Sequence, residues 1–408
     1  MLDYVIRNAR LPASQDTLDI GFAAGRIAAL EPGLVCDAPA YDAQGCLCCG
    51  GLIETHIHLD KSRIIDRCAP APGRGADAVR RVSEVKHTFT VEDVYSRAKA
   101  TLEDCIKNGA TRMRTHVEVD PKVGLRGFEG VKALVDEFAF AIDIELCVMP
   151  QEGLTNNPGT DELMVEALRR GATVVGAAPG YDTDHPGQIR RVFELAREFG
   201  VDIDMHLDFG NAPDDLDVHL VCELTEEYRL GGRVAIGHAT KLSTMPSDEQ
   251  VAMARRLGDA GVAVTVLPAT DLFLMGRDQT YNVKRGVVDA NLFVENGCNC
   301  SISTNNILNP FTPFGDCSLI RMANLHANTL QIGERDRIAE CFAMLTERSA
   351  QLMNLSDYGI AVGHPADVVV IDATTPAHAV AEIAQPLAAF KNGRRTVTRT
   401  RPELHRPS

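Results

Sequence analysis

The sequence contains no tryptophan, and aromatic residues make up only 5% of its 408 residues. No apolar run approaches the roughly 20 residues that a membrane-spanning helix needs. The amino terminus, MLDYVIRNARLP, has neither the basic start nor the continuous apolar stretch of a secretory signal peptide. We therefore expect a cytoplasmic protein that does not interact with a membrane.

Basic residues are scarce relative to acidic ones. The chain has 41 Lys and Arg against 56 Asp and Glu, which gives a formal net charge of −15. A protein that binds nucleic acid needs a basic surface to displace counterions from the phosphate backbone. The charge therefore argues against a nucleic-acid partner and leaves a small-molecule substrate open.

The cysteines lack the spacing of a disulfide framework. Twelve are scattered along the chain, and Cys46, Cys48 and Cys49 form the cluster CLCC. This cluster is compatible with a soft-metal site, but no second cysteine pair at zinc-finger spacing accompanies it. We interpret the cysteines as buried free thiols in a reducing compartment.

Short runs of alternating apolar and polar residues, broken by Gly and Pro, are present at both ends of the chain. They occur in residues 1–50 and again from YGIAVGHPADVVVIDA onward, over residues 357–400. Such runs predict small antiparallel strands joined by turns. We expect the two ends to pair into one β-sandwich.

Between the two ends, short apolar runs alternate with longer amphipathic segments, which is typical of repeated β-α units and a parallel sheet. Three amphipathic segments, at residues 91–109, 189–200 and 248–261, end at a glycine, as helices commonly do. Eight strands are predicted, over residues 52–60, 110–119, 144–151, 172–180, 201–208, 233–240, 262–269 and 298–305.

Polar residues fall at the carboxyl ends of these strands. They are His56, His58, His116, Gln151, His206, Asp208, His238 and Asn305. Such a ring converges on one point if the sheet closes, and a closed barrel carries its active site at these strand ends. We predict an α/β protein with a (β/α)8 TIM barrel over residues 51–356 as its metal-dependent catalytic domain; an open doubly wound sheet is the alternative.

The stretch THIHLDKS, residues 55–62, places His56 and His58 on the same face of the first strand. Two imidazoles so placed form half of a site for zinc, iron or cobalt. A single histidine on an apolar strand is more often a hydrogen-bonded core residue. Because His206 and His238 follow at the ends of strands five and six, the pattern favours metal binding.

Several stretches together resemble a known family. They are GGLIETHIHLD, RTHVEVD, MPQEG, IDMHLD, IGHAT, PFGDC and NLSDYGIAVGHPADVVVID. They are similar to the amidohydrolase superfamily and, within it, to the cytosine deaminase-like branch, which also contains hydrolases that release amines from N-alkylated triazine rings. The resemblance covers almost the whole chain and implies the same barrel and terminal sandwich.

The resemblance also implies one divalent metal ion, zinc or iron, with cobalt and manganese as alternatives. In the family the two histidines of HxH, a strand-five histidine and a strand-eight aspartate hold the metal, which implies His56, His58 and His206 here. The strand-six histidine, His238, is implied to activate the water, and Gln151 to hydrogen-bond the amide edge of the ring. An open metal site lowers the pKa of its water to near 7 and supplies a hydroxide that attacks a ring carbon bearing an amino group.

Two positions depart from the family pattern, and both lack an acid. SISTNNILNP has Asn305 in place of the strand-eight aspartate. Asparagine ligates weakly through its carbonyl oxygen and cannot act as a base at neutral pH. HLDFG has Phe209 in place of the glutamate, aspartate in some members, that shuttles a proton to the ring nitrogen.

Asp208 is a candidate for the missing acid. It lies two residues after His206, so it is expected on the same strand face, where it acts as the acid-base group or as a further ligand. The alternative is that Asp208 only fixes a neighbouring histidine or a lysine such as Lys61. The neutral Asn305 leaves the metal more electrophilic, so that His238 becomes the principal base.

We predict a metal-dependent hydrolase of a non-peptide C–N bond, which deaminates a pyrimidine- or triazine-like heterocycle. Hydrolysis of a cyclic amide on the same scaffold is one alternative. A ligand-binding relative that has lost catalysis is another, because both acids are missing. Gln151, Phe209, Asn306 and Asp271 are the predicted substrate contacts, and we expect a homo-oligomer.

Overall fold

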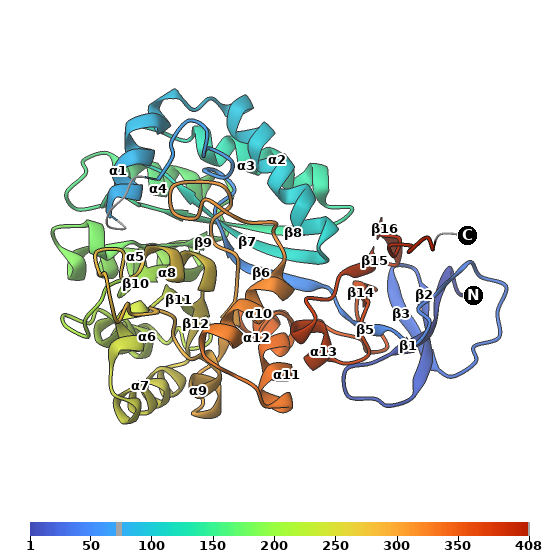
Figure 1. Cartoon of the computed structure of the whole chain (residues 1–408). Coiled ribbons are helices and arrows are strands. Elements are labelled where there is room, and N and C mark those ends of the chain that lie inside the picture. The colour runs from blue at the N-terminus through green and yellow to red at the C-terminus, as the bar shows by residue number, and fades with distance from the viewer. Residues whose placement is uncertain (71–75, 407–408) are drawn as a thin grey trace.

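The computed structural model describes residues 1–70 and 76–406, which contain two eight-stranded sheets. One sheet forms a ring surrounded by helices, and the other lies beside it and contains strands from both chain ends (Figure 1). Within the described ranges, no helix has the length and apolar character needed to cross a bilayer.

The ring is a closed parallel barrel in which the strands neighbour one another in chain order. Its strands are β6 (Leu52–Ile57), β7 (Ala110–Glu118), β8 (Asp143–Met149), β9 (Val174–Val175), β10 (Asp202–Leu207), β11 (Val234–His238), β12 (Val262–Val266) and β13 (Cys300–Ile302). Two hydrogen bonds close it: the His58 amide donates to the Asn305 carbonyl at 2.9 Å, and the Asn305 amide donates to the His56 carbonyl at 2.9 Å. The predicted TIM barrel is confirmed, and the open-sheet alternative is wrong.

The barrel strands are shorter than predicted at their carboxyl ends. There the backbone turns through the left-handed region, with φ of 49° at Asp208, 69° at His238 and 60° at Asn305. Non-glycine residues seldom adopt this conformation. Because the chain leaves the strand geometry at these residues, strand alternation does not fix the direction of the side chains there.

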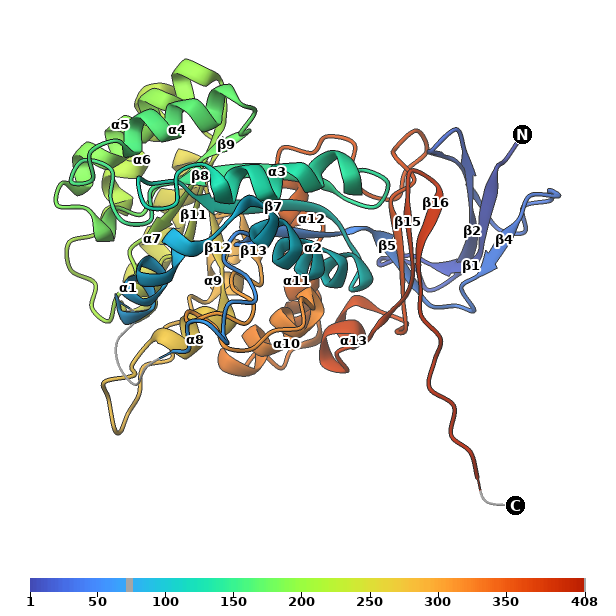
Figure 2. The same cartoon turned by 90° about the horizontal axis from the view of Figure 1, so that it is seen from above.

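Helices cover the outside of the barrel. They are α1 (Ala76–Val85), α2 (Val91–Lys107), α3 (Arg126–Phe138), α4 (Thr160–Arg169), α5 (His185–Phe199), α6 (Val218–Tyr228), α7 (Ser247–Ala260), α8 (Pro268–Leu274), α9 (Ala290–Glu295), α10 (Leu319–Thr329), α11 (Arg335–Ala343) and α12 (Glu347–Leu352). Gly200 and Gly261 cap α5 and α7 in the left-handed conformation, as predicted. The segment between α8 and α9 extends outward from the barrel (Figure 2).

The second sheet is built from both termini. Its strands are β1 (Tyr4–Arg10), β2 (Thr17–Ala23), β3 (Arg26–Glu31), β4 (Ala40–Asp42), β5 (Leu47–Gly50), β14 (Val368–Ile371), β15 (Pro386–Lys391) and β16 (Arg394–Thr398). β5 and β14 pair antiparallel and so join the two ends of the chain. Phe390 of β15 packs against Phe22 of β2 with ring centroids 5.7 Å apart, so the sheet folds over its own core as a sandwich.

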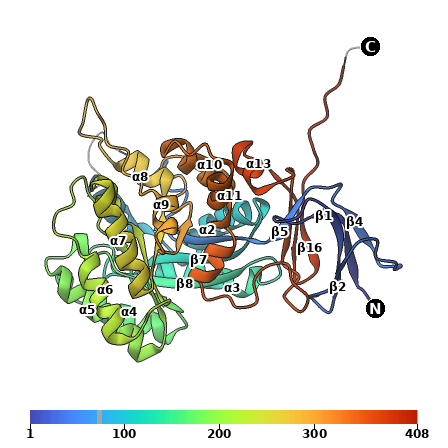
Figure 3. The same cartoon turned by 90° about the horizontal axis from the view of Figure 1, so that it is seen from below.

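Helices α10, α11 and α13 (Pro376–Ala381) lie between the barrel and this sandwich (Figure 3). Helix α13, which connects β14 to β15, packs against α10 and α11. Lys391 of β15 adds an ionic link, because its Nζ lies 2.7 Å from Asp143 at the start of β8. All twelve cysteines are free thiols, and all except Cys36 are buried, as predicted.

Candidate metal centre and its cavity

Three of the predicted metal ligands converge at the carboxyl end of the barrel. The Nε2 atom of His206 lies 3.2 Å from Nε2 of His56 and 2.9 Å from Nε2 of His58. Burial lowers the pKa of His56 to about 3, with a further contribution from His116, and burial also holds the pKa values of His58 and His206 well below the usual range. Neutral imidazole nitrogens aimed at one point are a donor set that suits zinc and similar metals.

Asn305 lies beside these histidines. Its Oδ1 atom is buried and has no hydrogen-bond partner among the described residues. Its Nδ2 atom lies 3.4 Å from Nε2 of His238. A buried amide oxygen normally has a partner, and a cation held by the three imidazoles would provide one. These residues therefore fit a single divalent metal ion.

Deeper in the barrel, Asp204 faces two histidine rings. Its Oδ1 atom lies 3.7 Å from Nδ1 of His56 and 3.4 Å from Nε2 of His116, and its Oδ2 atom accepts a hydrogen bond from Arg114 at 3.0 Å. The rings of His56 and His116 stack with centroids 3.8 Å apart. A carboxylate facing the second nitrogen of a ligating histidine orients its ring.

His56, His116 and Asp204 also lie close enough together to hold a cation of their own. A neutral imidazole, however, has only one nitrogen lone pair that can bind a metal. His56 therefore cannot bind one cation through Nδ1 and also bind, through Nε2, a cation shared with the other histidines. Asp204 was not among the residues predicted from the sequence, although IDMHLD places it two residues before His206 on the same strand face.

His238 is paired with Asp271. The Nδ1 atom of His238 lies 2.5 Å from Oδ1 of Asp271, whose other oxygen accepts a hydrogen bond from the Leu267 amide. Burial raises the pKa of Asp271, and the neighbouring His238 partly opposes this shift. Asp271 was predicted as a substrate contact. It lies instead in α8, which begins at Pro268 directly after β12, and its side chain is fully buried behind His238.

Asp208 does not lie on the strand face that was predicted for it. Because β10 ends at Leu207 and the chain then turns, the Asp208 carboxylate accepts hydrogen bonds from the amides of Asp217 and Val218, both at 3.0 Å. These contacts hold the start of α6. Burial raises the pKa of Asp208 to about 6. The suggested partner Lys61 pairs with Glu118 instead.

A cavity opens above the histidines. Its lining residues are His58, Lys61, Gln151, Tyr181, His206, Phe209, His238, Leu274, Asn306 and Phe311. Three of the four predicted substrate contacts, Gln151, Phe209 and Asn306, are among them. The ring of Phe209 stands edge-on to that of His238, with centroids 5.4 Å apart. Among these lining residues none carries a carboxylate, so the cavity offers hydrogen-bond donors and imidazoles but no acid.

Two side-chain amides of the cavity have a defined orientation. Nζ of Lys61 donates to Oε1 of Gln151 at 3.2 Å, and Nδ2 of Asn309 donates to Oδ1 of Asn306 at 2.7 Å. An ammonium group can only donate, so the Gln151 oxygen must face Lys61. Both amides are thus left with their NH2 groups to offer to a ligand.

An ionic cluster buried beneath the cavity holds Lys61. Glu118 accepts from Lys61 at 2.5 Å and from Lys86 at 3.3 Å, and Lys86 also pairs with Asp120 and Glu152. Burial alone raises the pKa of Glu118, but the two lysines outweigh it and lower this pKa to about 2. Glu118 is therefore ionised at neutral pH and fixes the position of Lys61.

Comparison with known proteins identifies the family of this chain. The profile of the Amidohydrolase family matches residues 144–397. The N-isopropylammelide isopropyl amidohydrolase of Pseudomonas sp. (strain ADP) is 26% identical over 407 residues, which cover 96% of each chain.

Solved structures agree with this match. The 5-methylcytosine deaminase from Klebsiella pneumoniae liganded with 5-fluorocytosine has a TM-score of 0.94 at 26% identity and covers 99% of both chains. The N-isopropylammelide isopropylaminohydrolase from Burkholderia multivorans ATCC 17616 has a TM-score of 0.85 at 25% identity and covers 98% of this chain and 99% of its own. The chain belongs to the amidohydrolase family and is a hydrolase of carbon–nitrogen bonds other than peptide bonds.

Proposed function

We propose that the chain holds one divalent metal ion, zinc or iron, through Nε2 of His56, His58 and His206 and through Oδ1 of Asn305. The convergence of the three Nε2 atoms is the observation that carries this proposal. When bound, such a metal lowers the pKa of water to near neutrality and so supplies the nucleophile for hydrolysis. Asp204 keeps His56 in position from behind.

His238 is proposed as the base. Because Asp271 binds its Nδ1 atom, the lone pair of the ring lies at Nε2, which faces Nδ2 of Asn305 at 3.4 Å. This atom takes a proton from the attacking water and then returns it to the departing amine. The Asp271 carboxylate stabilises the imidazolium between the two steps. One histidine thus covers the roles for which the family uses two acids.

The substrate is proposed to be a nitrogen heterocycle of the pyrimidine or triazine type that carries an exocyclic amino group. The cavity supports this class because the NH2 groups of Gln151 and Asn306 and the ammonium of Lys61 all donate hydrogen bonds. Donors complement ring carbonyl oxygens and unprotonated ring nitrogens. They also stabilise the negative charge that the ring gains during attack, in place of protonation by a glutamate. The named substrates of the relatives belong to the same class.

The twelve free cysteines support a location in the cytoplasm. Eleven of them are buried as thiols, and none forms a disulfide. Unpaired thiols persist in a reducing compartment. We therefore propose that the enzyme acts on heterocycles inside the cell.

The test combines metal analysis with a substrate panel. Protein purified without chelator or polyhistidine tag is expected to contain about one zinc or iron per chain, as a mononuclear site requires. Amino-substituted pyrimidines, triazines and pterins are then assayed for ammonia or amine release, with His238→Asn as the inactive control. Metal-loaded protein that binds these compounds but turns over none of them would contradict the proposed substrate class.

A further inference from the structure

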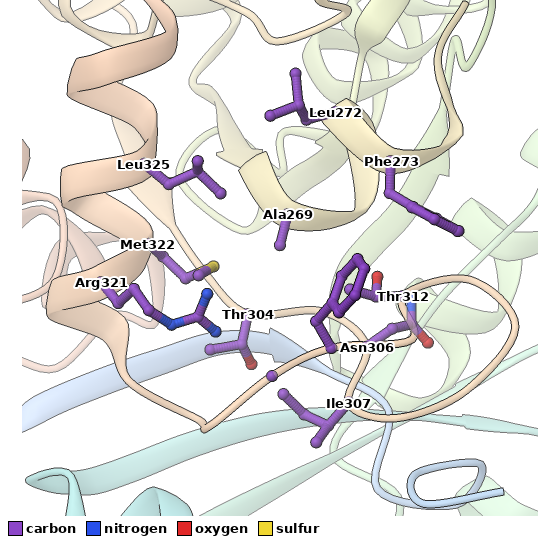
Figure 4. Close-up of a pocket in the computed structure, with 12 residues that line it drawn as sticks. Ala269, Leu272, Phe273, Thr304, Asn306, Ile307, Thr312, Arg321, Met322 and Leu325 are labelled. Carbon is purple, nitrogen blue, oxygen red and sulfur yellow. The ribbon is translucent and has the colours of Figure 1, made fainter. Parts of the chain in front are cut away.

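A second cavity adjoins the metal-centre cavity and shares Asn306 with it. It measures about 240 Å³ and lies between α8, the segment after β13 and α10 (Figure 4). Its apolar walls are formed by Ala269, Leu272, Phe273, Ile307, Met322 and Leu325. We name it the substituent pocket. None of the proposed metal ligands lines it.

The hydroxyl groups in the wall of the substituent pocket are already engaged. Oγ1 of Thr304 donates to the Glu54 carboxylate at 2.6 Å, and the hydroxyls of Thr312 and Thr270 bond each other at 2.6 Å. Both threonines of the wall are buried. Since these oxygens have partners within the protein, the surface left for a ligand is mainly hydrocarbon.

The charged residue in the wall is compensated. Arg321 reaches from α10 toward Thr304 along one side of the substituent pocket (Figure 4), and its Nε atom donates to Asp316 at 2.8 Å. The pair formed by Arg321 and Asp316 has no net charge. The pocket therefore suits a neutral apolar group better than a carboxylate.

The rim of the substituent pocket exposes large apolar side chains. Leu272 is 39% exposed and Phe314 is 61% exposed, and Phe314 stands edge-on to Phe273 with ring centroids 5.9 Å apart. Exposed apolar residues grouped around a concave apolar site mark a binding surface. Because the pocket shares Asn306 with the metal-centre cavity, a ligand that covers this rim lies next to that cavity.

We propose that the substituent pocket binds a neutral branched alkyl or aryl substituent carried by the heterocyclic substrate. The proposal rests on the proposed function, because it treats the occupant as part of the substrate. An apolar protein cavity of about 150 Å³ binds benzene, so the 240 Å³ found here accommodates an aryl ring or a branched alkyl group. Each buried methylene group is expected to strengthen binding about fourfold.

A binding experiment tests the substituent pocket without turnover. The probes are 4-fluorobenzyl alcohol and 4-fluorobenzoate, titrated against the full chain by 19F NMR. The neutral probe is expected to bind more tightly than the anion. Leu325→Trp, which fills the pocket from α10, is expected to weaken binding of the alcohol at least tenfold. Asn328→Trp adds the same side chain to an exposed position of the same helix and is expected to leave binding unchanged. Equal binding by both variants, or tighter binding of the anion, would overturn the proposal.

A turnover experiment links the substituent pocket to the substrate. Amino-heterocycles are assayed with and without an N-benzyl substituent. In Leu325→Trp, kcat/KM for the substituted compounds is expected to fall at least tenfold relative to the unsubstituted ones, with no such change in Asn328→Trp; a parallel fall would contradict the proposal. Met322→Phe repeats the test if Leu325→Trp does not fold. If no heterocycle is turned over by any variant, the proposed function fails, and the NMR titration still decides whether the pocket binds apolar groups.

Discussion

His238 and Asp271 form a buried hydrogen-bonded pair, with Nδ1 of the histidine 2.5 Å from Oδ1 of the aspartate. Two consecutive barrel units contribute the pair, since His238 ends β11 and Asp271 lies in α8 after β12. The carboxylate holds the proton on Nδ1, and Nε2 is then a proton acceptor beside Asn305. The proposed base thus stands at a cavity whose lining residues carry no carboxylate.

Removing this pair is expected to stop catalysis without removing the metal. His238→Asn should abolish turnover because no other lining group accepts a proton at that point, and Asp271→Asn should lower kcat by about 10²- to 10⁴-fold because the histidine loses its fixed tautomer. Both proteins should retain about one metal ion per chain. Elemental analysis with steady-state kinetics measures both quantities, and appreciable turnover by His238→Asn would refute the assigned base.

Substitution of one of the three converging histidines is expected to remove the metal, unlike substitution of His238 or Asp271. His206→Ala should lose most of its metal, because two imidazoles and an amide oxygen are a weak remaining set. His185→Ala is the matched control: His185 is a partly exposed histidine that pairs with Asp217 in the neighbouring α5–α6 region, and its loss should leave metal content unchanged. Equal metal content in both variants, measured by elemental analysis, would contradict the ligand assignment.

Asn305→Asp is expected to tighten metal binding. It replaces a neutral amide oxygen by a carboxylate oxygen, which is the stronger ligand for zinc or iron. We expect an increase in affinity on the order of tenfold, equivalent to about 1.4 kcal/mol, in competition with a fluorescent chelator. Asn306→Asp places the same charge one residue further along the chain. An equal gain in that control would show a general electrostatic effect rather than ligation by residue 305.

Lys61→Met is expected to weaken substrate binding. The variant keeps a similar side-chain length but removes the ammonium that fixes the Gln151 amide. Loss of a charged hydrogen bond costs about 1.5–3 kcal/mol, so KM should rise about tenfold or more. Lys122→Met is the control, since Lys122 belongs to the same ionic cluster through Glu152 but is an exposed residue outside the cavity. A KM unchanged by Lys61→Met would show that Gln151 needs no such support.

Much of this architecture could be predicted from the sequence. The eight apolar runs and the glycines that end the helices predicted repeated β-α units. Because consecutive parallel units usually lie side by side, their order along the chain also predicted the order of the strands in the barrel. The alternation of His56 and His58 on one strand placed two ligands together. His206 and His238 could be added because each ends a strand of the same barrel.

The remaining site could not be predicted from strand alternation because the chain leaves the strands at Asp208, His238 and Asn305 with positive φ. The turn at Asp208 directs its carboxylate to the amides at the start of α6. The pairing of His238 with Asp271 depends on where α8 begins relative to β11, which no local pattern encodes. Asp204 is the exception, since its spacing from His206 was visible in the sequence.

A buried histidine far from the proposed ligand set in the chain, His326 of α10, makes stability depend on pH. Both of its ring nitrogens are buried without a hydrogen-bond partner among the described residues. Burial lowers its pKa from 6.5 to about 4; Asp289 opposes this shift and Arg337 adds to it. Between these two pH values the unfolded chain binds a proton that the folded chain does not. Stability contributed by this residue therefore rises with pH from about 4 to 6.5.

His326→Leu is expected to remove this part of the pH dependence. Each pKa unit corresponds to about 1.4 kcal/mol, so the wild-type chain should lose about 3 kcal/mol more than the variant when the pH falls from 6.5 to 4. At pH 7 the variant should be at least as stable, because an apolar side chain replaces unpaired buried nitrogens. Urea unfolding at several pH values measures the difference, with the exposed His378→Leu as control. Parallel pH profiles for wild type and His326→Leu would show that His326 takes up its proton in the folded chain as readily as in the unfolded one.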